Sequence, residues 1–319
     1  MSLPLEPPLA PQLALSRKEL PTGEDYSYEV KLDGFRCLAF VDGDLLFLQS
    51  RNGRPLGRYF PELTFPAGHY VLDGEIVVRD ADGREDFDAL GQRVHPADSR
   101  VQRLSVETPA VYVAFDLLAE RGESLLERSF ADRRAALETL LLGEEFAASP
   151  VEQMETVATA QEAQGWLQNA EGAIAKERAA PYRPGERKGM VKVKRVRTID
   201  AVVVGWRPGK EPETVGALIL GLYDGGELRV VGHCSGLTAK EKRRLVGFLA
   251  PYETGERGSA DPSRWSSGKE LEWIALRPEL VVEIDFDHVS SGRIRHGAKL
   301  RRWRDDKPPA ECTFEQLSS

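Results

Sequence analysis

Short alternating strands separated by Asp-Gly turns are the feature that most constrains the fold of this chain. Residues 26–30 (YSYEV) and 68–78 (GHYVLDGEIVV) alternate between apolar and polar side chains, and residues 37–50 (CLAFVDGDLLFLQS) predict a hairpin that turns at Asp42-Gly43. Residues 111–120 (VYVAFDLLAE) predict a further apolar strand. Because tight turns connect antiparallel neighbours, this part of the chain is predicted to form antiparallel sheets.

Helical patterns interrupt these strands. Residues 129–143 (SFADRRAALETLLLG) and 156–170 (TVATAQEAQGWLQNA) each predict one helix. Strand character returns at residues 171–177 (EGAIAKE) and 189–196 (GMVKVKRV). The mixture predicts an α+β domain built around antiparallel sheets.

The pattern changes after residue 197. Strands are predicted within residues 200–206, 215–236 and 280–290, with an Asp224-Gly225 turn inside the second range. Residues 237–252 predict one helix, in which Thr238 and Glu241 have the spacing of a capping box. About five strands with one helix favour a small β-barrel of the OB type. We therefore predict two domains, residues 1–197 and 198–319, and a surface loop at residues 251–270.

The net charge of −8 by itself argues against a nucleic-acid-binding protein, yet the basic residues are concentrated in two segments. Residues 176–197 contain nine lysines and arginines, and residues 293–307 contain seven. Such segments suggest contact with a polyanion. On charge alone, two solvated surface strips remain the favoured interpretation.

Other signals exclude several classes of protein. No apolar run approaches the roughly 20 residues that cross a bilayer, and the proline-rich start has no basic segment before an apolar one, as a secretory signal would. Cys37, Cys234 and Cys312 lie far apart, which argues against a disulfide framework and a structural zinc site. We expect a cytoplasmic protein.

Strand parity places charged side chains of both signs opposite apolar ones in three of the strands. These charged residues are Glu29, Lys31, Asp73, Glu75, Lys192 and Lys194. If the three strands are neighbours, the charged faces would line one cleft. Position by position, a solvated strand face is the better interpretation, because half-exposed strands usually alternate in this way.

A charged cleft of this kind suits nucleotidyl transfer. An α-phosphate needs an unprotonated amine as its nucleophile, and carboxylates such as Glu75 and Glu171 could hold a hard divalent ion. The ordered combination of short motifs supports this interpretation over the solvated face. Residues 31–36 (KLDGFR) fit the K-x-D-G-x-R element of covalent nucleotidyltransferases. The motifs that follow are SRNG (50–53), LDGE (72–75), VAFDLL (113–118), EGAIAK (171–176) and VKVK (191–194).

This ordered series resembles the ATP-dependent DNA ligases across the first domain. The tail at residues 293–307 (RIRHGAKLRRWRDDK) resembles the closing R-x-D-K element of the small two-domain bacterial ligases, of the ligase C kind or the ligase domain of the end-joining ligase D kind. The resemblance implies a nucleotidyltransferase (adenylation) domain of antiparallel sheets with helices, followed by a C-terminal OB-fold β-barrel. It further implies the sealing of 3′-hydroxyl/5′-phosphate nicks in duplex DNA, through a lysyl-AMP intermediate and DNA-adenylate.

The resemblance also implies roles for individual residues. Lys31 would be the nucleophile that takes AMP, and Glu29 would lie near the adenine. Arg36 would reach the ribose or a DNA phosphate, and Arg51 would contact the nucleotide or the 5′-phosphate of the nick. Phe115 would stack on the adenine, although packing in an apolar strand explains this residue equally from its local sequence.

The remaining roles concern phosphate and metal. Glu75 would hold the ribose or a metal ion, Glu171 would help to bind Mg²⁺ or Mn²⁺, and Lys192 and Lys194 would contact the α-phosphate. The second domain would supply a set that orients the pyrophosphate. This set is Arg304, Asp306 and Lys307, and the turn at Asp33-Gly34 completes the lysine element.

We expect ATP and nicked duplex DNA as substrates and a monomer that acts in DNA repair, with repair proteins as partners, in the bacterial cytoplasm and associated with the nucleoid. Arg93 is a further candidate for DNA contact. An RNA ligase or an RNA-capping guanylyltransferase carries the same lysine element, so both remain alternatives. A non-catalytic OB-type nucleic-acid-binding protein is disfavoured, because the lysines and carboxylates of the motifs are all present.

Overall fold

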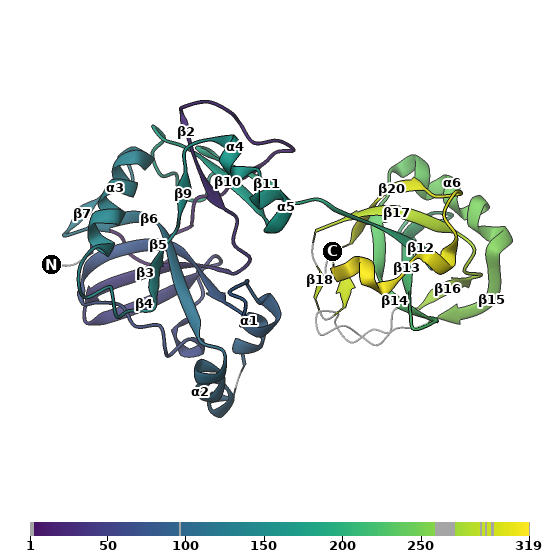
Figure 1. Cartoon of the computed structure of the whole chain (residues 1–319), viewed down its shortest axis with the longest axis horizontal. Coiled ribbons are helices and arrows are strands. Elements are labelled where there is room, and N and C mark those ends of the chain that lie inside the picture. The colour runs from purple at the N-terminus through teal and green to yellow at the C-terminus, as the bar shows by residue number, and fades with distance from the viewer. Residues whose placement is uncertain are drawn as a thin grey trace. The chain divides into compact units, whose positions relative to one another are not determined.

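The structure is a computed structural model that describes residues 3–95, 97–258, 272–287, 289–290, 292–294 and 297–318 (Figure 1). His288, Arg295, His296 and much of the loop predicted at residues 251–270 lie outside the described residues. The chain divides into two compact units, Met1–Arg195 and Val196–Ser319, and each is described by itself. Among the described residues, no helix has the length and apolar composition to span a membrane.

The first unit contains two sheets. One has the order β4 (Leu45–Ser50), β3 (Phe35–Gly43), β5 (Gly68–Val78), β6 (Ala110–Glu120) and β7 (Glu123–Ser124), all antiparallel, with β8 (Val151–Gln153) parallel to β6. The other has the order β1 (Leu15–Ser16), β11 (Met190–Lys194), β10 (Gly172–Glu177), β2 (Tyr26–Val30) and β9 (Thr156–Val157). The bounds of β2 and β5 are those that the alternating patterns predicted.

The helices of this unit are the 3-10 turn η1 (Gly57–Tyr59), α1 (Phe87–Arg93), α2 (Asp98–Glu107), α3 (Phe130–Leu141), α4 (Ala160–Ala163) and α5 (Trp166–Asn169). α1 and α3 pack on the first sheet, α4 and α5 pack on the second, and α2 packs on α1. The prediction of α3 is confirmed, and its first turn is capped by the Ser129 side chain, which accepts a hydrogen bond from the Asp132 backbone. The single helix predicted at residues 156–170 is wrong. Its first residues form β9, Thr159 caps α4, and the chain breaks again at Gly165 before α5.

The five-stranded sheet buries one face and leaves the other for charged residues. Tyr28, Ala173, Ala175 and Val193 form a core cluster with Ala163 of α4, and residues of α5 pack against it. Because side chains alternate along each strand, the charged residues of β2 and β11 lie on the opposite face. This face belongs to the candidate site.

The second unit is a closed barrel. Its ring is β12 (Arg197–Pro208), β13 (Val215–Asp224), β14 (Glu227–Gly236), β20 (Ala298–Trp303) and β17 (Val281–Phe286), and β12 pairs with both β13 and β17, which closes the ring. The other elements of this unit are β15 (Glu253–Gly258), β16 (Trp273–Leu276), β18 (Val289–Ser290), β19 (Arg293–Ile294), α6 (Ala239–Leu249) and the 3-10 turns η2 (Ala250–Tyr252), η3 (Pro309–Glu311) and η4 (Phe314–Ser318).

Two local predictions in the barrel are confirmed. The chain turns after Asp224 at Gly225 and Gly226, whose φ angles of 58° and 89° lie in the region that favours glycine. Thr238 and Glu241 form both hydrogen bonds of a capping box at the start of α6. A closed five-strand ring around a core that includes Val202, Leu220 and Ile284 confirms the predicted OB-type architecture, with more strands outside the ring than expected.

Candidate active site

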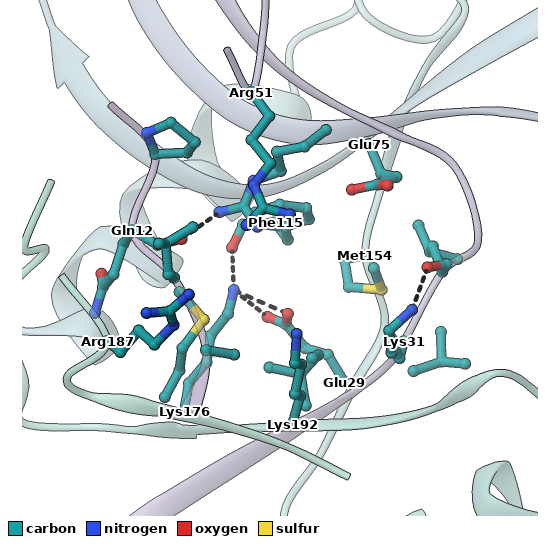
Figure 2. Close-up of a pocket in the computed structure, with 18 residues that line it drawn as sticks. Gln12, Glu29, Lys31, Arg51, Glu75, Phe115, Met154, Lys176, Arg187 and Lys192 are labelled. Atoms are coloured by element: carbon teal, nitrogen blue, oxygen red, sulfur yellow. Dashed lines mark hydrogen bonds and ion pairs between the residues drawn. The ribbon is translucent and has the colours of Figure 1, made fainter. Parts of the chain in front are cut away.

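A cavity of about 200 Å³ lies between the two sheets of the first unit (Figure 2). Seven of the predicted residues line it, namely Glu29, Lys31, Arg36, Arg51, Glu75, Phe115 and Lys192. The prediction of one cleft assumed that the three charged strands are neighbours in one sheet, and this assumption is wrong. β2 and β11 lie in one sheet with β10 between them, while β5 belongs to the other sheet. The charged faces therefore approach each other across the space between two sheets.

Lys31 follows the last residue of β2. Its backbone N–H donates to the Gly172 carbonyl at 3.0 Å, which continues the pairing with β10. The side-chain amine lies 3.3 Å from the Leu32 carbonyl and 3.4 Å from Glu171 Oε1. With a side-chain exposure of 19%, the amine is reachable from the cavity while its position is restrained by a carboxylate.

Gly34 allows the turn after Lys31 to pack closely on β5. A Cβ atom at this position would lie 2.4 Å from the Ile76 carbonyl oxygen and 2.7 Å from Glu75 Cγ. The glycine is therefore required by close approach rather than by a positive φ. The Asp33-Gly34 turn holds Lys31 and Glu75 against the same cavity.

Glu171 connects two of the predicted lysines. Its Oε1 lies 3.4 Å from the Lys31 amine and 3.6 Å from the Lys194 amine. Lys192, one residue before Val193 on β11, lines the cavity. Burial lowers the pKa of Lys192 from its ordinary value, and the cations of Lys194, Lys31 and Arg51 lower it further. The cavity thus has a region of concentrated positive charge.

Arg36 is held by a buried carboxylate from the LDGE motif. Its Nε and Nη2 atoms each donate to Asp73 at 2.6 Å, and Asp73 also accepts a hydrogen bond from the Tyr182 hydroxyl at 2.7 Å. The guanidinium lies 4.5 Å from the centroid of the Phe115 ring. Arg36 and Glu75 are paired in register between β3 and β5. Burial raises the pKa of Glu75 to about 7.

Glu29 belongs to an ion pair that the sequence did not reveal. Lys176 Nζ lies 2.8 Å from Glu29 Oε2, and it also donates to the Phe115 carbonyl at 3.2 Å (Figure 2). Both side chains are buried and both line the cavity. Burial raises the pKa of Glu29, and Lys176 opposes that shift. Lys176 ends the EGAIAK motif, but only the pairing of β10 with β2 shows its partner.

Further lining residues were missed, Met154, Ile174, Gln12 and Arg187 among them. Met154, near Phe115, and Ile174 supply apolar surface, while Gln12 and Arg187 come from segments without regular structure. Arg187 stood in the basic segment of the sequence, but nothing distinguished it there from its neighbours. Gln12 and Met154 carried no local signal, whereas Ile174 lies inside the EGAIAK motif but was assigned no role.

The predicted residues of the second domain lie after β20. Arg304 Nη1 donates to Asp200 at 2.9 and 3.0 Å, and Arg304 Nε donates to Asp306 at 2.9 Å. Lys307 pairs with Glu311 at 2.9 Å. The R-x-D-K element is therefore ordered by ion pairs within its own unit.

The DNA contact suggested for Arg93 is wrong. Its side chain is fully buried and donates to both carboxylate oxygens of Glu62, at 2.6 and 2.9 Å. It also donates to the carbonyls of Tyr59 and Thr108. Arg93 supports the packing of α1.

Comparison with known families identifies the chain. The family model for the ATP dependent DNA ligase domain matches residues 7–194. The family model for the ATP dependent DNA ligase C terminal region matches residues 211–307. This chain belongs to the ATP-dependent DNA ligases. The resemblance inferred from the ordered motifs is thereby confirmed.

Among relatives of this ligase, DNA ligase C1 of Mycolicibacterium smegmatis is 43% identical, and the match covers 100% of this chain and 96% of the relative. DNA ligase C of Mycobacterium tuberculosis is 41% identical, with 99% of this chain and 96% of the relative covered. Among solved structures, the ligase domain of Mycobacterium tuberculosis LigD matches with a TM-score of 0.52 at 32% identity, covering 96% of this chain and 98% of that domain. The fold of this chain therefore agrees with that of a solved ligase domain.

Proposed function

We propose that this ligase seals nicks between a 3′-hydroxyl and a 5′-phosphate in duplex DNA, by way of AMP bound covalently to Lys31. The observation that carries the proposal is the Lys31 amine at the wall of a cavity that also presents Lys192, Glu75 and Phe115. Residues 1–197 would act as the adenylation domain and residues 198–319 as the OB-fold domain.

Three transfers make up the proposed reaction. The Lys31 nitrogen attacks the α-phosphorus of ATP, a nitrogen–phosphorus bond forms, and the bond to pyrophosphate breaks. The 5′-phosphate of the nick then takes AMP from Lys31, and the 3′-hydroxyl finally displaces AMP from that phosphate. Such transfers depend mainly on positioning and on charge neutralisation.

The cavity residues divide between the parts of the nucleotide. We assign Phe115 to the face of the adenine, Glu29 to its edge, and Arg36 to the ribose or a DNA phosphate. We assign Arg51 to the nucleotide or the 5′-phosphate of the nick. Arg36 is already oriented by Asp73, so its Nη1 group could bind a ligand without a change of side-chain rotamer.

Lys192 and Lys194 are assigned to the α-phosphate. Lys194 pairs with Glu171 at 3.6 Å, and a phosphate would compete for that cation. The second unit would supply the groups that orient pyrophosphate, which are Arg304, Asp306 and Lys307. Arg304 would exchange part of its contact with Asp200 for the anion.

The residues fit a divalent ion of the magnesium type. No group of three or more His, Cys, Asp or Glu side chains suited to a metal occurs within the described part of the chain. Mg²⁺ is typically bound by one or two carboxylates together with the phosphates of a substrate. Glu75 and Glu171 would hold Mg²⁺ or Mn²⁺, which would neutralise phosphate charge during transfer.

A repair role is proposed from the relatives. Proteins named multifunctional non-homologous end joining DNA repair protein LigD are 33% identical over 91% of this chain, which covers 37% of their length. We propose that this ligase works as a monomer on nicked DNA of the nucleoid, in the cytoplasm and alongside other repair proteins. The basic segments would follow the phosphate backbone.

A labelling experiment tests the proposal. The protein is incubated with Mg²⁺ and α-labelled ATP or GTP, then denatured, and the covalent label is measured. We expect label from ATP that disappears in Lys31→Ala and that transfers to nicked DNA. Label from GTP alone would indicate a capping guanylyltransferase, transfer to RNA nicks only would indicate an RNA ligase, and no label from either nucleotide would contradict the proposal.

A further inference from the structure

The segment before β1 forms one wall of the cavity. We call residues 3–14 the N-terminal arm. Its residues 11–14 line the cavity, although no motif of the sequence includes them. The arm has no regular secondary structure, so other contacts must hold this wall in place.

The arm is attached to both sheets that enclose the cavity. The Leu9 backbone exchanges two hydrogen bonds with the Gln49 side chain of β4, at 2.9 and 2.6 Å, and Gln49 is fully buried. At its other end the arm enters β1, where Leu15 pairs with Val191 of β11. The arm therefore crosses from one sheet to the other along the cavity.

Gln12 is the central attachment of the arm and is only 4% exposed. Its backbone N–H donates to the Tyr182 hydroxyl at 2.9 Å, and its backbone carbonyl accepts from Arg36 at 3.4 Å. Its side chain binds a second segment. Nε2 donates to the Lys188 carbonyl, and Oε1 accepts from the Arg183 backbone at 3.3 Å.

These side-chain bonds span a loop that carries a cation. We call residues 183–189 the arm-bound loop. Neighbours of Gln12 hold it too, since the Pro11 carbonyl accepts from Gly185 and Leu13 donates to the Glu186 carbonyl. Arg187 lies inside this loop, is exposed, and lines the cavity. Figure 2 shows Arg187 beside Gln12, on the side of the cavity away from Lys31.

We propose that Gln12 is a positioning residue for ATP, acting through Arg187. The Gln12 amide fixes both ends of the arm-bound loop, so that the Arg187 guanidinium faces the cavity and meets an anionic group of the nucleotide. This inference rests on the proposed use of the cavity for ATP. Neither residue contacts the Lys31 amine in the described contacts, so both should affect ATP binding more than the rate of transfer.

The test compares Gln12→Ala, Arg187→Ala and the double variant in the full chain. Formation of the Lys31–AMP bond is measured against ATP concentration with Mg²⁺ present. Each single variant is expected to raise the half-saturating ATP concentration by about fivefold to tenfold, with the maximal rate changed by less than about twofold. Because Gln12 acts through Arg187, the double variant should resemble Arg187→Ala within about twofold.

Two controls separate positioning from folding. Gln12→Glu keeps the side-chain shape, replaces the donor to Lys188 with an acceptor oxygen and adds a negative charge, so it should raise the half-saturating ATP concentration at least as much as Gln12→Ala. Gln161→Ala, at an exposed position of α4, should behave as the unaltered protein. Thermal unfolding of each variant is recorded. Since Arg187 is exposed, Arg187→Ala tests the inference even if both Gln12 variants unfold.

Each outcome has one meaning. The inference would be overturned if the half-saturating ATP concentration were unchanged in Arg187→Ala or in a folded Gln12 variant. It would also be overturned if the increase in the double variant equalled the product of the two single increases. In both cases the unaltered protein still forms Lys31–AMP, and the proposed function stands. Failure of the unaltered protein to take label from ATP would instead contradict the proposed function, and the inference with it.

Discussion

The side-chain amine of Lys31 lies 3.4 Å from Oε1 of Glu171, and this contact joins the end of β2 to the start of β10. The same oxygen lies 3.6 Å from the amine of Lys194. One carboxylate thus balances two cations beside the atom proposed to carry AMP. The charge of Glu171 should therefore matter to the reaction, because it restrains the Lys31 amine.

Glu171→Gln tests this relationship. The substitution keeps the side-chain shape and removes both the charge that restrains Lys31 and one proposed ligand of the divalent ion. We expect the rate of Lys31–AMP formation at saturating ATP to fall by about 10- to 100-fold, the usual cost of losing a group that orients a metal site. Glu177→Gln, at the exposed end of the same strand, should stay within about twofold. Equal rates in both variants would contradict the role.

The ion pair between Lys176 and Glu29 predicts a stability effect. Lys176→Met leaves the Glu29 carboxylate buried without its counter-ion, and this should reduce the free energy of unfolding of the first unit by about 3–5 kcal/mol. Adding Glu29→Gln should restore much of the loss. Lys188→Met removes the pair with Glu186, whose side chains are 76% and 46% exposed, and should leave the free energy of unfolding nearly unchanged. Urea unfolding followed by circular dichroism checks all three.

Strand patterns predicted much of the fold because the strands are short and glycine- or proline-containing turns mark their ends. β2 and β5 begin and end where the alternation does. The helix α3 was equally clear, since its cap and its apolar spacing agree. The pattern at residues 156–170 misled because its first residues pair as β9, and because a turn at Gln164 and Gly165 separates α4 from α5, each only four residues long.

The site was predicted less completely, because the sequence does not show which strands pair with or face one another. Motif order identified seven of the lining residues, but a pattern along the chain does not say which strands face each other. Lys176 is 147 residues from Glu29, and Gln12 is 176 residues from Lys188. Such contacts are created only when the two sheets meet, so local sequence carries no signal for them.

His233 predicts a pH effect in the barrel. Burial and the nearby Arg207 lower the pKa of His233 from 6.5. The unfolded chain therefore binds more protons below pH 6.5, and stability is lost as the pH falls through that value. Between pH 7 and pH 5 the unaltered protein should therefore lose more of its free energy of unfolding than His233→Gln does. The free energy of unfolding of each protein is measured by urea unfolding at both pH values. An equal decrease in the two proteins between pH 7 and pH 5 would contradict the prediction.

Arg304→Ala is expected to slow only the step that releases pyrophosphate. Its guanidinium is held by Asp200 and Asp306, so it is oriented before any nucleotide arrives. If it stabilises departing pyrophosphate, Arg304→Ala should slow Lys31–AMP formation by about 100-fold, as for loss of one preorganised charge partner. Sealing of a nick that already carries 5′-AMP releases no pyrophosphate, and its rate should change by less than about threefold.

Arg302→Ala provides the matched control for this prediction. Arg302 lies on β20 just before Arg304, and its side chain is 62% exposed and pairs with Glu283. If Arg302 and Arg304 acted only through general attraction to DNA, both variants would slow sealing of the adenylated nick to a similar degree and would leave Lys31–AMP formation, which needs no DNA, unchanged. A large loss in the first step that is specific to Arg304→Ala would assign this guanidinium to the leaving group. A loss confined to the sealing step would assign it to DNA binding instead.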